Sequence, residues 1–466
     1  MKKYIIVITS LFTLINHAEP SNKKEITKEI ELNETLKVEL PSGDINVVFS
    51  EDKQVKLRVS GISLKYFSLK KIGGEVQVVF DMANYISEEN TKSIKLEDAG
   101  SNFNQQEGGN NIVFIRNGRF MRSKTLEPQH TLVSNFVFSE NIKVNIEVPQ
   151  ELNLSLGTRN GNIQMLRPVK GNVDVDVHVG SIRVSDVYGN FSAKAMGGEI
   201  STGTISGNAN IYVETGNVES YDISGDAIIQ INGGNVKLGN VMGKLDLKAT
   251  NGFVSVKKTD KNSTINVSMG DIKIETANEN LFASTNMGSI LINSLNANSR
   301  LTAKSGSISL NDVKKNLLAQ VEVGDIKVNL NSNTEQEQIS LSSDNGNIEL
   351  NLKQKMKANV SFSIGGNGIL NTTLTKNFFS EKQGSFLVNG GGNTFIQLKT
   401  KDACLSIKYP DGYPSPNIFP VLSKASPAAS SSVRPRITVS KFASALTSKV
   451  CPPEITNERK GKEGCA

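Results

Sequence analysis

Residues 216–233 read GNVESYDISGDAIIQING, and this unit of eighteen residues repeats along most of the chain. Its first glycine recurs at a constant interval of eighteen residues, and an isoleucine or valine stands two places after every glycine of the series. The nine glycines are Gly180, Gly198, Gly216, Gly234, Gly252, Gly270, Gly288, Gly306 and Gly324. Related Gly-Asn-Ile motifs begin at Gly161 and Gly346. So regular an array predicts a repeat architecture in which each unit is stable only when stacked on its neighbours.

Each unit contains two alternating segments that are typical of β-strands. A second turn signal follows nine residues after the first glycine, and apolar residues then alternate with polar ones, as in Ala227, Ile229 and Ile231. Because a strand points successive side chains to opposite faces, the alternate apolar residues face inward. Glycine or asparagine at the corners tolerates a positive φ. The pattern predicts an all-β parallel β-solenoid with the Ile/Val series as a buried column.

Three segments resemble the bacterial putative-adhesin family, domains of unknown function that repeat Gly-Asp/Asn-Ile-x-Val. They are the opening VELPSGDINV at residues 38–47, the lead-in IKVNIEVP at residues 142–149, and the closing GGGNTFIQL at residues 390–398. The resemblance covers about residues 32–408 and rests on the whole array, since each single motif is weak. It implies a right-handed parallel β-helix on an envelope or secreted protein, and it brings no catalytic motif.

The flanking segments differ from the repeats in composition. Residues 1–18 are predicted to be a secretory signal peptide, because Lys2 and Lys3 precede a run of twelve apolar or small residues; the alternative is an uncleaved anchor. Residues 19–150 are expected to form an N-terminal β region with a polar insertion at 85–135. The solenoid repeats are assigned to 151–408. The tail, residues 409–466, is rich in proline and serine and is predicted to be disordered.

Charge and cysteine usage exclude several classes. The formal charge of +6 divides into +2 from Lys2 and Lys3, +4 from residues 409–466, and zero from residues 19–408, so nucleic acid is not an expected partner. No window after the signal is apolar enough to span a bilayer as a helix. The cysteines are Cys404, Cys451 and Cys465. Either Cys451 and Cys465 close a small loop, or all three are incidental residues of the tail.

The sequence predicts no catalytic or metal-binding site. Asp174 and Asp176 share the outward face of one strand, as in β-solenoids that cleave acidic polysaccharides, but Ser192 and Lys194 take their places one coil later. A salt-bridged surface ladder is therefore expected rather than a metal site. After signal removal the histidines are His130 and His178. Two isolated histidines provide neither a zinc site nor a catalytic triad, so we expect no enzyme, cofactor or metal.

Three functions remain open at this point. The first is an exported surface or envelope scaffold, located in the periplasm, on the cell surface or in the medium, that binds a glycan or protein through its lateral face. The alternatives are an envelope-stress sensor or regulatory module, and a glycan-processing enzyme built on a β-helix. Since the fold alone does not decide among them, the insertion at residues 85–135 is predicted to carry specificity because it interrupts the repeat.

Overall fold

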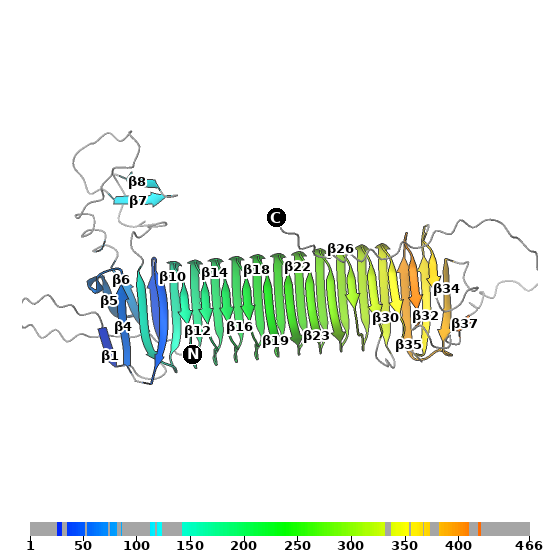
Figure 1. The fold of residues 1–466 in the computed structure, drawn as a ribbon, viewed down its shortest axis with the longest axis horizontal. Helices are drawn as coiled ribbons and strands as arrows, with labels where there is room; N and C mark the ends of the chain where they lie inside the picture. The colour runs from blue at the N-terminus through cyan, green and yellow to red at the C-terminus, as the bar shows by residue number, and fades with distance from the viewer. Residues whose placement is uncertain are drawn as a thin grey trace, which may run out of the picture.

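The computed structural model is an elongated β-solenoid whose strands run across its long axis (Figure 1). It describes residues 26–29, 35–51, 54–72, 75–81, 85, 112–116, 119–123, 142–330, 337–353, 356–366, 368–372, 382–409 and 418–420. The predicted signal peptide, residues 1–18, lies outside these ranges. Within them, no helix has the length and apolar character needed to cross a membrane.

Two long sheets form the sides of the solenoid, one of 18 strands and one of 17 strands. We call them the wide sheet and the narrow sheet, because most repeat strands of the first have seven residues and many of the second have three. The repeat strands of the wide sheet are β10 (Asn153–Asn160), β12 (Val173–Val179), β14 (Phe191–Gly197), β16 (Ala209–Thr215), β18 (Ala227–Gly233), β20 (Leu245–Asn251), β22 (Ser263–Met269), β24 (Leu281–Met287), β26 (Ser299–Ser305), β28 (Leu317–Val323) and β30 (Gln338–Asn345). Those of the narrow sheet are β11 (Ile163–Met165), β13 (Ile182–Val184), β15 (Ile200–Thr202), β17 (Val218–Ser220), β19 (Val236–Val241), β21 (Val254–Thr259), β23 (Ile272–Ala277), β25 (Ile290–Leu295), β27 (Ile308–Leu310), β29 (Ile326–Asn329) and β31 (Ile348–Asn351).

Successive coils pair in parallel and in register, which confirms the predicted solenoid. For example, Val218 aligns with Ile200 of the previous coil and with Val236 of the next. The predicted Ile/Val column is buried along its whole length, and no member from Ile182 to Ile326 is more than 1% exposed. Parallel stacking therefore places identical apolar positions over one another, at a rise of about 4.8 Å per coil, to form a continuous core.

The corner glycines are required by both backbone conformation and space. Gly216 has a φ of 152° and Gly234 a φ of 131°. A Cβ atom on either residue would lie 1.6 Å from the carbonyl oxygen of the corner glycine one coil earlier. Since no side chain fits at that distance, glycine is the residue that lets consecutive corners stack.

The asparagines at the corners have a different role from the predicted one. Among the described residues, Asn389 is the one non-glycine residue with a positive φ, so the corner asparagines do not serve to provide that conformation. Instead, their side-chain oxygens accept hydrogen bonds from the next coil: Asn217 Oδ1 accepts from the N–H of Asn235 at 2.9 Å, and Asn172 Oδ1 accepts from the N–H of Asn190 at 2.8 Å. Asparagine thus satisfies backbone donors where the strand ladder is interrupted.

The stack begins before the predicted repeats. The strands at this end are β1 (Ile26–Glu29), β2 (Thr35–Leu40), β3 (Asp44–Ser50), β4 (Gln54–Ser60), β5 (Phe67–Ile72), β6 (Glu75–Phe80) and β9 (Lys143–Pro149), with one 3₁₀ turn η1 (Leu64–Tyr66). Strands β2 and β3 pair in parallel with β10 and β11, so Ile45 continues the buried column below Ile163. Further out, pairing becomes antiparallel in β4–β9, β1–β4 and β5–β6. This change ends the parallel stack.

The other end also closes with antiparallel pairing. Its strands are β32 (Ala358–Ile364), β33 (Leu370–Thr372), β34 (Gln383–Val388), β35 (Thr394–Thr400), β36 (Leu405–Lys408) and β37 (Ile418–Pro420). Strand β34 pairs antiparallel with β32, and β37 pairs antiparallel with β34. Since β37 belongs to the segment 409–466, part of the predicted tail adds an edge strand to the wide sheet. Short antiparallel edges at both ends limit further strand addition.

Candidate binding groove and lateral face

A groove of about 540 Å³ lies on the outer face of the wide sheet near its N-terminal end. Strands β2, β6, β10 and β12 provide its walls and floor. Its described lining residues are Lys37, Glu39, Leu40, Pro41, Gln77, Val78, Val79, Phe80, Gly157, Thr158, Arg159, Asp176 and His178. The groove combines exposed polar and charged groups with an apolar edge at Phe80.

Gly157 forms the floor of the groove. In the register of the sheet it lies between Glu39 of β2 and Asp176 of β12, whose side chains point outward. Because glycine has no side chain, the space between the two carboxylates is left open. A Cβ atom at this position would lie 3.6 Å from the carbonyl oxygen of Asp176 and 3.7 Å from Glu39 Cγ, both ordinary contacts. The position therefore tolerates larger residues, which makes it suitable for testing the groove.

The charges of the groove are mixed. Lys37 Nζ lies 2.5 Å from Glu39 Oε1, and these two side chains are 29% and 67% exposed. Arg159, Asp176 and His178 are also exposed at the rim. Two cationic and two anionic side chains leave no net formal charge with histidine neutral. A polar or mixed-charge partner fits this lining better than a strongly charged polymer.

The predicted candidates Asp174, Asp176 and His178 all lie exposed on β12, as the alternation of the strand requires. The predicted salt-bridged ladder is wrong here, because neither Asp174 nor Asp176 forms an ion pair with any described residue, although Asp176 aligns with Lys194. Among the described residues, no group of three or more His, Cys, Asp and Glu side chains could hold a metal ion. His130 lies outside the described residues.

Cys404, which precedes β36, is disulfide-bonded. Cys451 and Cys465, which were predicted either to close a small loop or to be incidental, lie outside the described residues.

The base of the insertion lies beside the groove. Strand β6 ends at Phe80, and the N–H of the following Asp81 donates to the carbonyl oxygen of Tyr66 at 2.7 Å. Tyr85 is buried and packs against the rings of Tyr66 and Phe80, with centroids 5.2 and 5.6 Å apart. This aromatic cluster fixes the point at which the chain leaves the repeat.

The described part of the insertion contains a small antiparallel hairpin of β7 (Ile112–Arg116) and β8 (Arg119–Ser123). It forms a two-stranded sheet of its own, separate from the wide and narrow sheets. The apolar residues of these two strands, among them Phe114 and Phe120, show that the insertion predicted at 85–135 is not uniformly polar.

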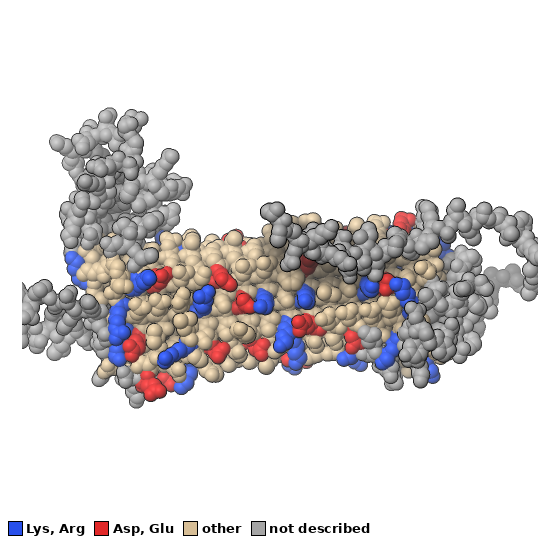
Figure 2. Space-filling view, viewed as in Figure 1, with Lys and Arg blue, Asp and Glu red and all other residues tan. Residues whose placement is uncertain are grey.

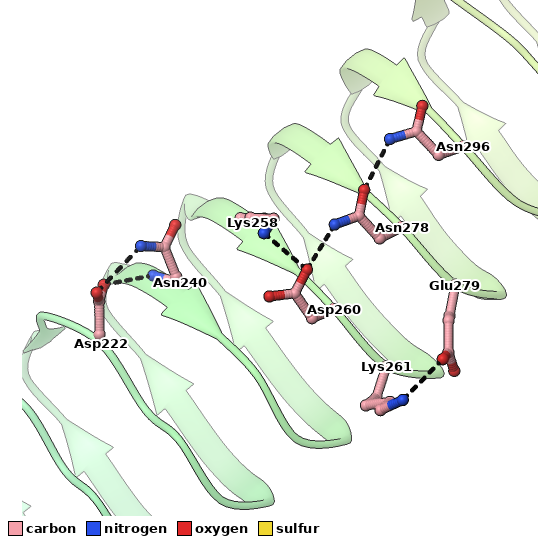
Figure 3. A network of polar contacts seen from close by, with 8 residues as sticks. All are labelled: Asp222, Asn240, Lys258, Asp260, Lys261, Asn278, Glu279 and Asn296. Carbon is pink, nitrogen blue, oxygen red and sulfur yellow. Dashed lines mark hydrogen bonds and ion pairs between the residues drawn. The ribbon is translucent and has the colours of Figure 1, made fainter.

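The lateral face has interspersed charges. On the outer face of the narrow sheet Lys237 Nζ lies 2.7 Å from Glu219 Oε1 of the preceding coil. Figure 2 shows acidic and basic side chains intermixed along the visible side rather than gathered by sign. At one corner, Asp260 accepts hydrogen bonds from Lys258 and Asn278, and Asn278 accepts one from Asn296 (Figure 3). These contacts hold the polar surface in a regular arrangement.

The groove residues Lys37, Glu39, Gly157 and Arg159 were not predicted. Gly157 gave the one usable signal, since a glycine within a strand often marks a close approach or an open space. The other groove residues are found only when residues 35–40 are known to pair with residues 153–160, and a long segment separates these two strands in the sequence.

Comparisons place this architecture among known proteins. No curated protein matches the sequence. One similar solved structure is a "putative cell adhesion protein" from Clostridium sporogenes, with 9% identity and a TM-score of 0.16, covering 83% of this chain and 99% of that one. Another is a "putative adhesin" from Bacteroides fragilis, with 12% identity and a TM-score of 0.20, covering 83% of this chain and 97% of that one. The Toastrack DUF4097 family matches residues 84–296 and 278–402. The family matches confirm the predicted resemblance to a domain of unknown function, and because they span more than half of the 466 residues, the chain belongs to the Toastrack DUF4097 family.

Proposed function

We propose that the protein is an exported, non-enzymatic scaffold of the cell envelope or surface, which binds a glycan or protein partner through its lateral face. The observation that carries the proposal is the position of the groove. It lies at the base of the insertion, where the repeat is interrupted and the outward side chains leave an open floor at Gly157. In the other coils the inward side chains pack in the core, so a partner contacts outward side chains and the corners.

The surface chemistry supports binding rather than catalysis. Asp174 and Asp176 face Ser192 and Lys194 of the next coil instead of further carboxylates. General acid–base cleavage of a glycan needs two carboxyl groups placed on either side of the scissile bond. Of the two carboxylates that flank Gly157 in the groove, Glu39 is engaged in an ion pair with Lys37 at 2.5 Å. Broad, hydrated contacts with small polar side chains suit a moderate-affinity surface interaction.

The test is a comparison of partners captured by three forms of the mature chain: wild type, a form with residues 86–135 replaced by a short Gly/Ser linker, and Gly157→Gln. The last variant fills the groove, because a side chain is sterically tolerated there. Gly233→Gln is the matched control, since a Cβ atom at this wide-sheet glycine meets one atom within 4 Å, at 3.8 Å, away from the groove. We expect weaker capture of envelope glycans or proteins with the linker form and with Gly157→Gln, and unchanged capture with Gly233→Gln.

Equal capture by all forms would show that neither the groove nor the insertion binds the partner. If the wild type captures nothing, the proposed adhesive function is rejected. Export is tested separately by fractionation and N-terminal sequencing of the native protein. A mature chain that starts near Glu19 is expected, and an intact Met1 in a cytosolic fraction would contradict export.

A further inference from the structure

Tyr221 is the most exposed large apolar or aromatic residue of the described chain, at 71%. It follows β17 at a corner of the solenoid. The equivalent positions of the two adjacent coils are Gly203 and Gly239, as the pairing of Thr202 with Ser220 and of Ser220 with Leu238 requires. The N–H of Gly239 donates to the carbonyl oxygen of Tyr221 at 2.9 Å, which confirms that the backbones are in register. A tyrosine therefore projects from a stretch of this column that is otherwise bare backbone.

Fixed polar groups surround this bare backbone. Asp222 Oδ1 accepts from the N–H of Asn240 at 2.8 Å, its Oδ2 accepts from Asn240 Nδ2 at 3.1 Å, and Figure 3 shows this pair at the corner. Asp186 Oδ1 accepts from the N–H of Thr204 at 2.7 Å. A Cβ atom on Gly239 would come within 2.6 Å of Asp222 Oδ1, and one on Gly203 within 2.3 Å of Asp186 Oδ1. A side chain at either glycine would clash with the neighbouring carboxylate, so the space beside the Tyr221 ring stays open.

We infer that this corner, which we call the Tyr221 platform, binds a sugar ring of a neutral glycan. The platform consists of Tyr221, Gly203, Gly239, Asp186 and Asp222. An exposed aromatic ring offers a flat face to the C–H groups of a sugar, and carboxylate and amide oxygens accept hydrogen bonds from its hydroxyls. The inference rests on the proposed surface-binding function and names one ligand class for it.

The surroundings favour an uncharged ligand. Tyr188, which is 58% exposed, is not part of the platform, because it aligns with Ser206 and Ser224, three residues further along the coil than the Tyr221 position. The platform carries two carboxylates, whereas the cations on the preceding strands are Arg183 and Lys237, and Lys237 is held by Glu219 at 2.7 Å. Sugars with carboxylate or sulfate groups would be repelled by Asp186 and Asp222.

The experiment measures binding of the mature chain to a panel of neutral and anionic oligosaccharides, first on an array and then by titration calorimetry. The variants are Tyr221→Ala and Tyr221→Phe, with Phe282→Ala as the matched control because Phe282 is 52% exposed on the wide sheet. We expect neutral glycan binding that weakens about tenfold in Tyr221→Ala and is retained in Tyr221→Phe and Phe282→Ala. Because Tyr221 is exposed, all variants should keep the thermal unfolding midpoint of the wild type.

Equal binding by wild type and Tyr221→Ala would overturn the platform, as would binding of anionic sugars alone. A change of oligomeric state in Tyr221→Ala without loss of glycan binding would assign the residue to contacts between copies instead. If the wild type binds no glycan, the platform is rejected, while capture of protein partners still tests the proposed scaffold function independently.

Discussion

The hydroxyl of Thr202 donates a hydrogen bond to the hydroxyl of Ser220 at 2.8 Å, one coil away and inside the core. Both residues are buried, at 2% and 3% exposure, in a column whose other members include Val184 and Leu238. The core tolerates these two hydroxyl groups because they are hydrogen-bonded to each other. The pair is an isolated polar contact in a column of apolar side chains.

The pair should therefore behave as a unit. Ser220→Ala leaves the Thr202 hydroxyl without its partner and should lower the free energy of unfolding by about 1–3 kcal/mol. The double variant Thr202→Val/Ser220→Ala removes both polar groups at nearly constant volume and should cost less than the single variant. Urea unfolding of the four forms in a double-mutant cycle measures the difference. Strictly additive effects would show that the two hydroxyls do not stabilise each other.

The buried Ile/Val column should not accept a charge. Ile272 is 0% exposed, so Ile272→Asp places an unpaired carboxylate in the core and should cost more than about 4 kcal/mol. The adjacent Lys273 lies on the outer face of the same strand, and Lys273→Asp should change stability by less than about 1 kcal/mol. Thermal and urea unfolding of both variants decide the matter; similar losses would contradict the inward assignment.

This column shows which part of the fold the sequence predicted well. The spacing of eighteen residues determines which side chains stack, and the alternation determines which face is buried, so the sequence alone predicts the buried column from Ile182 to Ile326. The ends were harder to predict. At one end β4 pairs antiparallel with β9, and at the other β34 pairs antiparallel with β32. Strand β35 lies between β30 and β32, out of sequence order. No repeat pattern encodes these pairings. The groove was missed for the same reason, since Gly157 and Glu39 become neighbours only through this stacking.

Thr259 offers a stabilising substitution. Its side chain is fully buried between Val241 and Ala277 of the adjacent coils, and its hydroxyl has no hydrogen-bond partner. Thr259→Val replaces the hydroxyl with a methyl group of similar size and should raise the free energy of unfolding by about 1 kcal/mol. Thr285→Val is a useful contrast, because Thr285 Oγ1 donates to the carbonyl oxygen of Gly270 at 3.1 Å and its loss should destabilise. If both variants are destabilised equally, the Thr259 hydroxyl has a partner in solution.

Glu349 should contribute to the pH dependence of stability. Burial alone would raise the pKa of its carboxyl, but hydrogen bonds from Asn351 and Lys408 and the charge of Lys327 outweigh it and hold the pKa below its ordinary value. A depressed folded-state pKa stabilises the fold above the unfolded pKa of about 4.3, and this contribution is lost as the pH falls through the folded value. Glu349→Gln should therefore cost up to about 1 kcal/mol at neutral pH. The stability difference between wild type and variant should disappear in acid; a difference that persists at low pH would point to packing rather than charge.

The corner ladder is interrupted at Phe253, and repairing it is the last test. The N–H of Phe253 donates to Asn235 Oδ1 at 2.9 Å, but Phe253 has no acceptor to offer the next coil at Asp271, and its ring is 40% exposed. Phe253→Asn would supply an oxygen where Asn217 and Asn235 already have one, and it would remove an exposed ring. We expect a gain of about 1 kcal/mol in the free energy of unfolding, from one additional hydrogen bond to the backbone. Phe253→Ala is the control, since it removes the ring without adding an acceptor. If both variants are more stable than the wild type, removal of the exposed ring is the cause rather than a new hydrogen bond. If both are less stable, Phe253 packs more tightly than its exposure indicates.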